Sequence, residues 1–174
     1  TLEIDASDDV TGLQVTLYYT VFEQHDIITR RVRIHNPTAS SFWLQDVKSA
    51  CIDFPTASFD LIHLWGDWGK ERTVEKQKLP HGITTIASAR GVSGHMHNPF
   101  IALAQTGATE ESGEVYGFHL VYSGNFAAHI EVNAEDSTRV VMGINEQTFC
   151  WELQPGAVFD TPELIMVYAS KGIG

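Results

Sequence analysis

The segment Leu64–Arg72 holds, within nine residues, the side-chain types that bind sugars. Aromatic rings pack against the CH groups of a sugar, while carboxylate, amide and guanidinium groups bond to its hydroxyls. Asp67, Trp68 and Arg72 supply such groups, so they are candidate sugar contacts. The competing interpretation is structural, with one tryptophan in the protein core and Arg72 paired with Glu71 or another carboxylate.

A second segment, Arg90–Phe100, interleaves glycines, histidines and aromatic residues. Residues two apart in an extended chain share a face, so His95 and His97 offer two imidazoles to Zn²⁺ or Cu²⁺. A zinc site needs a third and usually a fourth ligand, and the sequence indicates none. We therefore expect no metal, with one histidine bridging backbone groups and the other on the surface. His97 and Asn98 are further candidates for sugar contact.

Motifs of known catalytic sites are missing from the sequence. It contains no Gly-x-Ser-x-Gly elbow and no phosphate-binding glycine loop before a helix. Glycoside hydrolysis uses two carboxyl groups, about 5 to 5.5 Å apart in retaining enzymes. No acidic residue here lies in a motif typical of a nucleophile or an acid. The sequence therefore predicts no catalytic residue and no cofactor in this segment. The acids considered are Asp53, Asp60, Asp67, Glu71 and Glu163.

The charge of the chain excludes some partners. Eleven basic and 22 acidic residues give a net charge of -11. Such a surface repels nucleic acid phosphates and anionic membranes, whereas a neutral sugar is indifferent to it. No apolar run reaches the roughly 18 to 20 residues that span a bilayer. We therefore expect neither a nucleic acid nor a membrane as partner.

The two cysteines lie in apolar sequence surroundings. Ala50 and Ile52 flank Cys51, and aromatic residues flank Cys150. A disulfide scaffold in a chain of this length would need more cysteines, so we expect two buried free thiols. Free thiols favour a reducing compartment, which predicts a cytoplasmic location.

The elements that position these residues follow from period-two alternation. Apolar residues alternate with polar ones between Leu13 and Val21. Ile28, Val32 and Ile34 share one face of the next run, with Thr29 on the other. No apolar stripe at helical spacing lasts three turns. Further strand-like runs are 42–47, 59–65, 84–87, 100–104, 115–122, 129–133, 140–144, 148–153 and 164–168.

These runs predict an all-β fold with few or no helices, a sandwich of antiparallel sheets that forms a single domain over residues 1–174. The charge-rich segment Lys70–Lys78 alternates in sign and is expected to be a solvated loop or hairpin.

The motifs together resemble the N-terminal β-domain of family 36 α-galactosidases over nearly the whole chain. The segments that carry the resemblance occur in order: Asp9–Val15, Tyr19–Glu23, Asp26–Asn36, Asp53–Pro55, Trp68–Arg72, Arg90–Phe100, Tyr122–Phe126, Phe149–Leu153, Phe159–Glu163 and Tyr168. Lys70 stands where the family usually has Arg, Gly94 where a second Ser is common, and Met96 where Gln is common. Lysine lacks the planar fork of arginine, so planar recognition at position 70 is in doubt.

The resemblance implies a supersandwich of galactose-mutarotase-like topology, the later part of a domain that precedes a catalytic (β/α)₈ barrel. The family's nucleophile, in a Lys-Trp-Asp motif, and its acid/base lie in that barrel, and the motif is absent here. The parent enzyme would hydrolyse terminal α-galactosyl residues of melibiose- or raffinose-type sugars with retention and without metal. Its β-domain would contact its own barrel and neighbouring subunits, in a homotetramer.

Two loops are the expected contributors to an active-site entrance in such an assembly, the Trp68 loop and the loop from His95 to Phe100. Because the initial part of the family's domain is expected to be missing, unpaired strand edges are also expected. Two alternatives remain open from the residues themselves: an independent carbohydrate-binding module, and a purely structural interaction sandwich.

Overall fold

The computed structural model describes residues 1–174, which form fifteen strands and two short 3₁₀ helices. The strands are β1 (Leu2–Ser7), β2 (Gln14–Phe22), β3 (Ile27–His35), β4 (Phe42–Leu44), β5 (Lys48–Phe54), β6 (Phe59–Trp65), β7 (Thr73–Lys78), β8 (Gly82–Ala87), β9 (His97–Gln105), β10 (Val115–Leu120), β11 (Phe126–Val132), β12 (Thr138–Ile144), β13 (Trp151–Leu153), β14 (Val158–Asp160) and β15 (Leu164–Ala169). The helices are η1 (Glu23–His25) and η2 (Glu146–Thr148). The expected all-β fold is confirmed. None of its helices has the length and apolar character that crossing a membrane requires.

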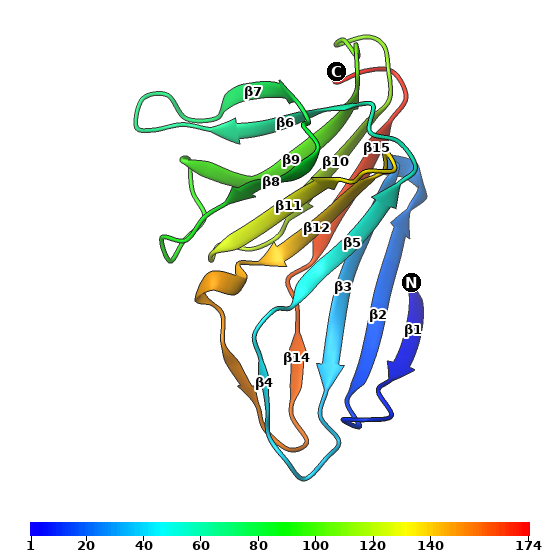
Figure 1. Ribbon diagram of the computed structural model, residues 1–174, viewed down its shortest axis with the longest axis vertical. Coiled ribbons are helices and arrows are strands. Elements are labelled where there is room, and N and C mark those ends of the chain that lie inside the picture. The colour runs from blue at the N-terminus through cyan, green and yellow to red at the C-terminus, as the bar shows by residue number, and fades with distance from the viewer.

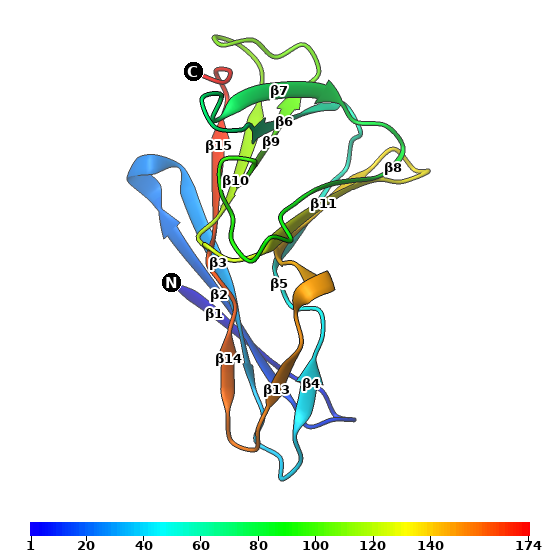
Figure 2. The same ribbon diagram turned by 90° about the vertical axis from the view of Figure 1, so that its left-hand side faces the viewer.

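Three antiparallel sheets make up the fold (Figure 1). The large sheet has the order β1-β2-β3-β15-β10-β9-β6-β7, and β14 pairs with β3 beside this path. A four-stranded sheet, β5-β12-β11-β8, lies over the β15 to β6 part of the large sheet (Figure 2). The two-stranded sheet β13-β4 lies beside the lower part of β3 and β14 (Figure 2).

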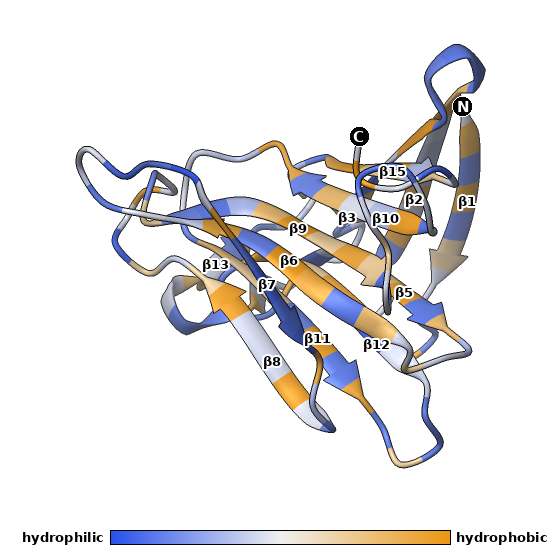
Figure 3. Ribbon diagram, turned by 90° about the horizontal axis from the view of Figure 1, so that it is seen from above, coloured by the Kyte–Doolittle hydropathy of each residue, from blue (hydrophilic) through white to orange (hydrophobic).

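The core fills the space between the large sheet and the four-stranded sheet. Alternate residues of each strand point into it, which gives the alternating hydropathy bands visible along β11 (Figure 3). Leu61, Ile101 and Leu103 enter from one side, and Phe126 and Ile130 from the other, each fully buried. Aliphatic and aromatic side chains buried from both sheets are the main stabilising term of such a sandwich.

The strand predictions hold with defined exceptions. The run 59–65 is strand β6 as predicted. The run 42–47 is a strand only over Phe42–Leu44, and in the run 148–153 only Trp151–Leu153 is a strand. The charge-rich segment is a hairpin rather than a loop, because β7 pairs with β6 along its whole length. Strands β1, β5 and β14 were not predicted.

The prediction of buried thiols is wrong, although both cysteines are free. Cys51 lies on β5 between Ala50 and Ile52, which point into the core, so its own side chain points outward and is exposed. Cys150 precedes β13 and is also exposed. Apolar neighbours along a strand therefore indicate the burial of the neighbours and not of the residue between them.

Candidate functional site

The first candidate segment forms the tight turn that joins β6 to β7. Within it, the Lys70 backbone N–H donates to the Asp67 carbonyl oxygen at 2.9 Å. A Cβ atom at Gly66 would lie 2.2 Å from the Lys70 carbonyl oxygen, so only glycine fits there. Gly69 and Arg72 have positive φ angles of 78° and 58°, which turn the chain back into β7. The glycines thus fold this segment into a protruding turn.

The turn presents its side chains to solvent. Trp68 at the tip is 89% exposed. The Glu71 carboxylate accepts a hydrogen bond from the Gly69 backbone N–H at 2.9 Å. That bond, followed by the bond from its own backbone N–H, lowers the pKa of Glu71, so this carboxylate stays charged in moderate acid. An exposed indole beside fixed carboxylates is a surface suited to contact with another molecule.

The second candidate segment, between β8 and β9, is tied to the turn that follows β10. The Gly91 backbone N–H donates to Asn125 Oδ1 at 2.6 Å, and the Ser93 backbone N–H donates to the Ser123 carbonyl oxygen at 2.9 Å. Ser93 Oγ donates to the Tyr122 carbonyl oxygen at 3.0 Å, and Ser88 Oγ to that of Val92 at 2.9 Å. Residues of the Arg90–Phe100 motif and of the Tyr122–Phe126 motif therefore hold this loop in place.

The backbone-bridging role predicted for one histidine of this loop is wrong, whereas the surface position predicted for the other is confirmed. Neither the His95 nor the His97 ring forms a hydrogen bond with a backbone group, because serine and asparagine side chains supply those bonds. Both rings are instead exposed to solvent. No group of three or more His, Cys, Asp or Glu side chains has an arrangement that could hold a metal ion.

The structure brings the two candidate segments together. The Gly66 backbone N–H donates to the Met96 carbonyl oxygen at 3.3 Å, and Trp65 pairs with His97 across β6 and β9. His95 Nε2 lies 4.0 Å from Asp67 Oδ1. A cavity of about 490 Å³ opens between them. Its lining comprises Asp67, Ala87, Ser88, Ala89, Arg90, Val92, Gly94, His95, Met96 and His97.

Of the five predicted sugar contacts, only Asp67 and His97 line this cavity. Trp68 and Arg72 lie on the protruding turn outside it. Asn98 is half-buried on β9, and its side-chain nitrogen has no hydrogen-bond partner in the chain.

Both structural alternatives for the turn are wrong. All four tryptophans are exposed, with values of 61% for Trp43, 39% for Trp65, 89% for Trp68 and 51% for Trp151. Arg72 forms none of the ion pairs in the chain. The side chains of the turn are therefore free to contact another molecule.

Two features beside the site were not predicted, an exposed bond of Trp65 and the burial of His63. Trp65 Nε1 donates to Glu75 Oε2 at 2.9 Å, which fixes the indole above the β6–β7 hairpin. His63 is buried, and its Nδ1 atom has no partner in the chain. Burial lowers the pKa of His63, with nearby Glu75 raising it and His97 lowering it by smaller amounts. Arg90 in the cavity lining was also missed, although its place in the glycine-rich segment pointed to it.

The cavity has one carboxylate in its lining, that of Asp67. It also offers a guanidinium group and two imidazoles, which suits hydrogen bonding to hydroxyl groups. Two opposed carboxyl groups, the arrangement that cleaves glycosidic bonds, are not present in its lining. The site can bind, but it lacks the pair of acids for hydrolysis.

Comparison with known proteins gives consistent matches. A sequence model described as the glycosyl hydrolase family 36 N-terminal domain matches residues 1–154. The alpha-galactosidase AgaA of Geobacillus stearothermophilus is 50% identical over 173 residues, which cover 99% of this chain and 24% of that protein. The bifunctional alpha-galactosidase/sucrose kinase AgaSK of Mediterraneibacter gnavus is 39% identical over 173 residues, covering 99% of this chain and 18% of AgaSK.

Solved structures agree with the sequence matches. The crystal structure of GH36 alpha-galactosidase AgaA superposes with a TM-score of 0.95 at 49% identity, covering 98% of this chain and 24% of that one. The alpha-galactosidase from Lactobacillus brevis gives a TM-score of 0.95 at 40% identity, covering 98% and 23%. Variants of AgaA have been solved in complex with stachyose and with raffinose. The chain thus spans about a quarter of the length of these two relatives.

Proposed function

Because the chain belongs to the glycosyl hydrolase family 36 N-terminal domain family, we propose that it is the non-catalytic β-domain of a longer α-galactosidase. The longer protein hydrolyses terminal α-galactosyl residues of oligosaccharides of the melibiose and raffinose type. The observation that carries this proposal is the lining of the candidate cavity, which holds a single carboxylate. The two acids that hydrolysis requires therefore belong to a separate catalytic part, a (β/α)₈ barrel.

The same proposal gives the candidate site a role in binding. The Trp68 turn and the His95–Phe100 loop shape the entrance to the active site of the assembled enzyme. Asp67, Trp68, Arg72, His97 and Asn98 are the proposed sugar contacts. The exposure of Trp68 supports this role, because an exposed indole ring is a surface on which a sugar ring packs.

We further propose that the domain packs on its own barrel and on neighbouring subunits in a homotetramer. Large apolar side chains are exposed on the adjacent strands β1, β2 and β3, among them Leu2 at 58%, Val21 at 59% and Ile28 at 41%. Side chains of this kind are typical of surfaces covered in an assembly. Light scattering of the full-length protein tests this, and a monomeric mass would contradict it.

A cytoplasmic location is proposed as well. Cys51 and Cys150 are exposed free thiols, and thiols of that kind persist in a reducing compartment.

Activity of the full-length protein tests the main proposal. It should hydrolyse p-nitrophenyl α-galactoside and raffinose, whereas the 174-residue chain should hydrolyse neither. Trp68→Ala should lower kcat/KM for raffinose about tenfold, as the loss of one stacking contact of about 1.4 kcal/mol predicts. Trp43→Ala, on β4, is the matched control and should leave kcat/KM unchanged. Hydrolysis by the 174-residue chain would refute the non-catalytic role.

The exposed Trp68 also supports a second candidate function, an independent carbohydrate-binding module. Calorimetry with raffinose separates the two. Heat of binding to the isolated chain, lost in Trp68→Ala, favours the module. No heat with the isolated chain, together with hydrolysis by the full-length protein, favours the accessory domain.

A further inference from the structure

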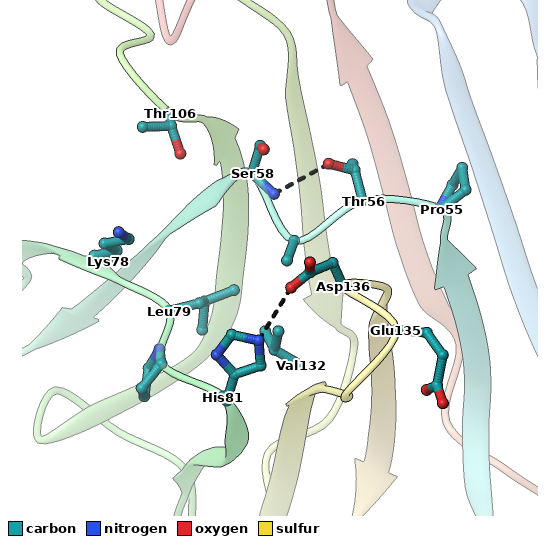
Figure 4. Close-up of a pocket in the computed structure, with 12 residues that line it drawn as sticks. Pro55, Thr56, Ser58, Lys78, Leu79, His81, Thr106, Val132, Glu135 and Asp136 are labelled. Atoms are coloured by element: carbon teal, nitrogen blue, oxygen red, sulfur yellow. Dashed lines mark hydrogen bonds and ion pairs between the residues drawn. The ribbon is translucent and has the colours of Figure 1, made fainter.

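A second concavity lies at the end of the β6–β7 hairpin opposite the Trp68 turn (Figure 4). Its volume is about 900 Å³. Four connections between strands form its walls: 55–58 before β6, 79–81 after β7, Thr106 after β9, and 135–136 between β11 and β12. No part of the candidate site lines this cleft.

The cleft has a fixed shape. Leu79 and Val132 form a buried floor, at 5% and 3% exposure. Across the opening, His81 Nε2 lies 3.0 Å from Asp136 Oδ1, as the dashed line in Figure 4 marks. Thr106 is held to the β5–β6 connection by its backbone N–H, which donates to the Ser58 carbonyl oxygen at 2.9 Å. The walls are thus joined to each other, and the cleft is preformed.

Several polar groups around the cleft have unused hydrogen-bonding capacity. Ser58 Oγ, Thr106 Oγ1 and Lys78 Nζ form no hydrogen bond within the chain, and the Glu135 carboxylate forms neither a hydrogen bond nor an ion pair. Thr56 Oγ1 accepts a bond from the Ser58 backbone N–H at 3.1 Å and keeps its own proton to donate. The cleft thus offers both donors and acceptors to a ligand.

The charges of the lining favour a neutral ligand. Lys78 lies in the same lining as Glu135 and Asp136, and the His81 ring is paired with Asp136, so charges of both signs are present in the cleft. An anion would meet the two carboxylates, and a cation would meet the Lys78 ammonium group. A neutral molecule rich in hydroxyl groups is repelled by neither kind of charge.

The lining also argues against a protein partner. It contains no aromatic side chain and none of the exposed tryptophans. Protein interfaces are enriched in Trp, Tyr, Phe, Met and Arg, and depleted in Lys, Glu, Asp and Ser. The depleted types are the ones found here.

We propose that this cleft is a second carbohydrate site, which binds an α-galactoside oligosaccharide without cleaving it. The choice of sugar rests on the proposed function, whereas the polar and neutral character of the ligand rests on the cleft alone. Side chains of Thr56, Ser58, Lys78, Thr106 and Glu135 bond the hydroxyls, and the Leu79 and Val132 floor contacts CH groups. Because no aromatic ring stacks on the sugar, we expect a dissociation constant on the order of millimolar.

Saturation-transfer difference NMR of the full-length protein with stachyose tests this proposal. Saturating 1-deoxygalactonojirimycin, a ligand in one AgaA structure, blocks the hydrolytic site, so that any remaining signal reports a second site. We expect a remaining stachyose signal, with about tenfold weaker binding in the double variant Lys78→Ala/Glu135→Ala, which loses two charge-assisted hydrogen bonds. Glu111→Ala, an exposed glutamate outside the lining, is the matched control and should bind as the unmodified protein does.

Loss of the whole signal under inhibitor in the unmodified protein would overturn the proposal, whatever the variants do. An equal signal in the double variant and the control would also overturn it, because the sugar would then bind elsewhere. Hydrolysis of p-nitrophenyl α-galactoside is measured on the same samples. Its absence from the unmodified protein would refute the proposed function, while the stachyose signal would still report on the cleft.

Discussion

Two parts of the large sheet differ in the burial of their apolar side chains, more than their sequences suggest. The covered part, β15 to β6, lies under the four-stranded sheet, and the uncovered part is β1 to β3. Where the four-stranded sheet lies over the large sheet, inward-pointing residues such as Leu120 and Leu164 are fully buried. Paired residues of adjacent strands share a face, so the same row continues through Arg30 and Tyr19 to Leu2. Leu2, at the end of this row, is 58% exposed. One row of side chains thus changes from core to surface because the covering sheet stops at β5, next to β3.

This difference has a physical meaning for the molecule. Because apolar and polar residues alternate along the strands, each part has one face suited to burial. Only the covered part has a second sheet within the chain against which that face packs. The other part carries apolar side chains that no layer of this chain covers, which agrees with the proposed packing on a barrel and on neighbouring subunits. Stability should therefore concentrate in the covered part.

The largest expected effect comes from the covered core. Phe126→Ala should destabilise the chain by about 3–5 kcal/mol, because it leaves a cavity where a ring is fully buried. Ile4→Ala, on the uncovered face at 44% exposure, should cost about 1 kcal/mol or less. Chemical denaturation of both variants measures the two values. Equal losses would mean that the uncovered part is packed as tightly as the covered one.

Two glycines differ in the space that a Cβ atom would find beside the backbone. Gly66→Ala should cost about 1–3 kcal/mol and displace the Trp68 turn, because its Cβ would meet the Lys70 carbonyl oxygen at 2.2 Å. Gly94→Ala is the matched control, since a Cβ there meets nothing within 4 Å. The midpoints of thermal unfolding should separate the two variants. A tolerated Gly66→Ala would mean that the turn can relax without loss.

Hydrogen bonds give a smaller contrast. Asn125→Ala removes the bond from the Gly91 backbone N–H and the one to Thr148 Oγ1, and should cost about 1–2 kcal/mol. Thr16→Ala removes one exposed bond to Asp5 Oδ1 in the uncovered part, and should cost about 0.5 kcal/mol or less. Hydrogen exchange of the β8–β9 loop should accelerate only in Asn125→Ala. Acceleration in both variants would contradict a local anchor.

The pH dependence is the smallest expected effect. Burial lowers the pKa of His63 below its unfolded value of 6.5, so the unfolded chain binds more protons at acid pH. The stabilisation from a neutral His63 is complete above pH 6.5 and declines as the pH falls from 6.5 to the folded pKa. Denaturation at several pH values should show this slope in the unmodified chain and a flatter one in His63→Gln. The control Ile4→Ala, on the uncovered face, should lower the free energy of unfolding equally at every pH. An unchanged slope in His63→Gln would rule out His63 as the source of the pH dependence.

Prediction of strands from the sequence succeeded where alternation is complete. Strand β6 has the bounds that the pattern predicts. Strand β5 was missed because Cys51 counts as apolar and hides the alternation of Ala50, Ile52 and Phe54. In strand β1 every second residue is polar, but no layer packs on the apolar residues between them. Its formation as a strand therefore depends on its pairing with β2.

Of the five predicted sugar contacts, Asp67 and His97 line the candidate cavity, and their role in binding stays a prediction. Their residue types and turn positions are local properties, readable within a few residues. The Trp68 turn contacts the His95–Phe100 loop because β6 pairs with β9, and the paired residues lie more than thirty positions apart in the sequence. The burial of His63 depends on the same pairing and on β7.

The sequence by itself determined the all-β class, the turns made by its glycines and the absence of a catalytic motif. These features follow from backbone sterics and from two-residue alternation, which act over short distances. Only the tertiary structure decided which faces are covered, that all four tryptophans are exposed, and that the motif residues around Asn125 anchor a loop. Burial is a property of two surfaces in contact, and a strand pattern specifies only one of them.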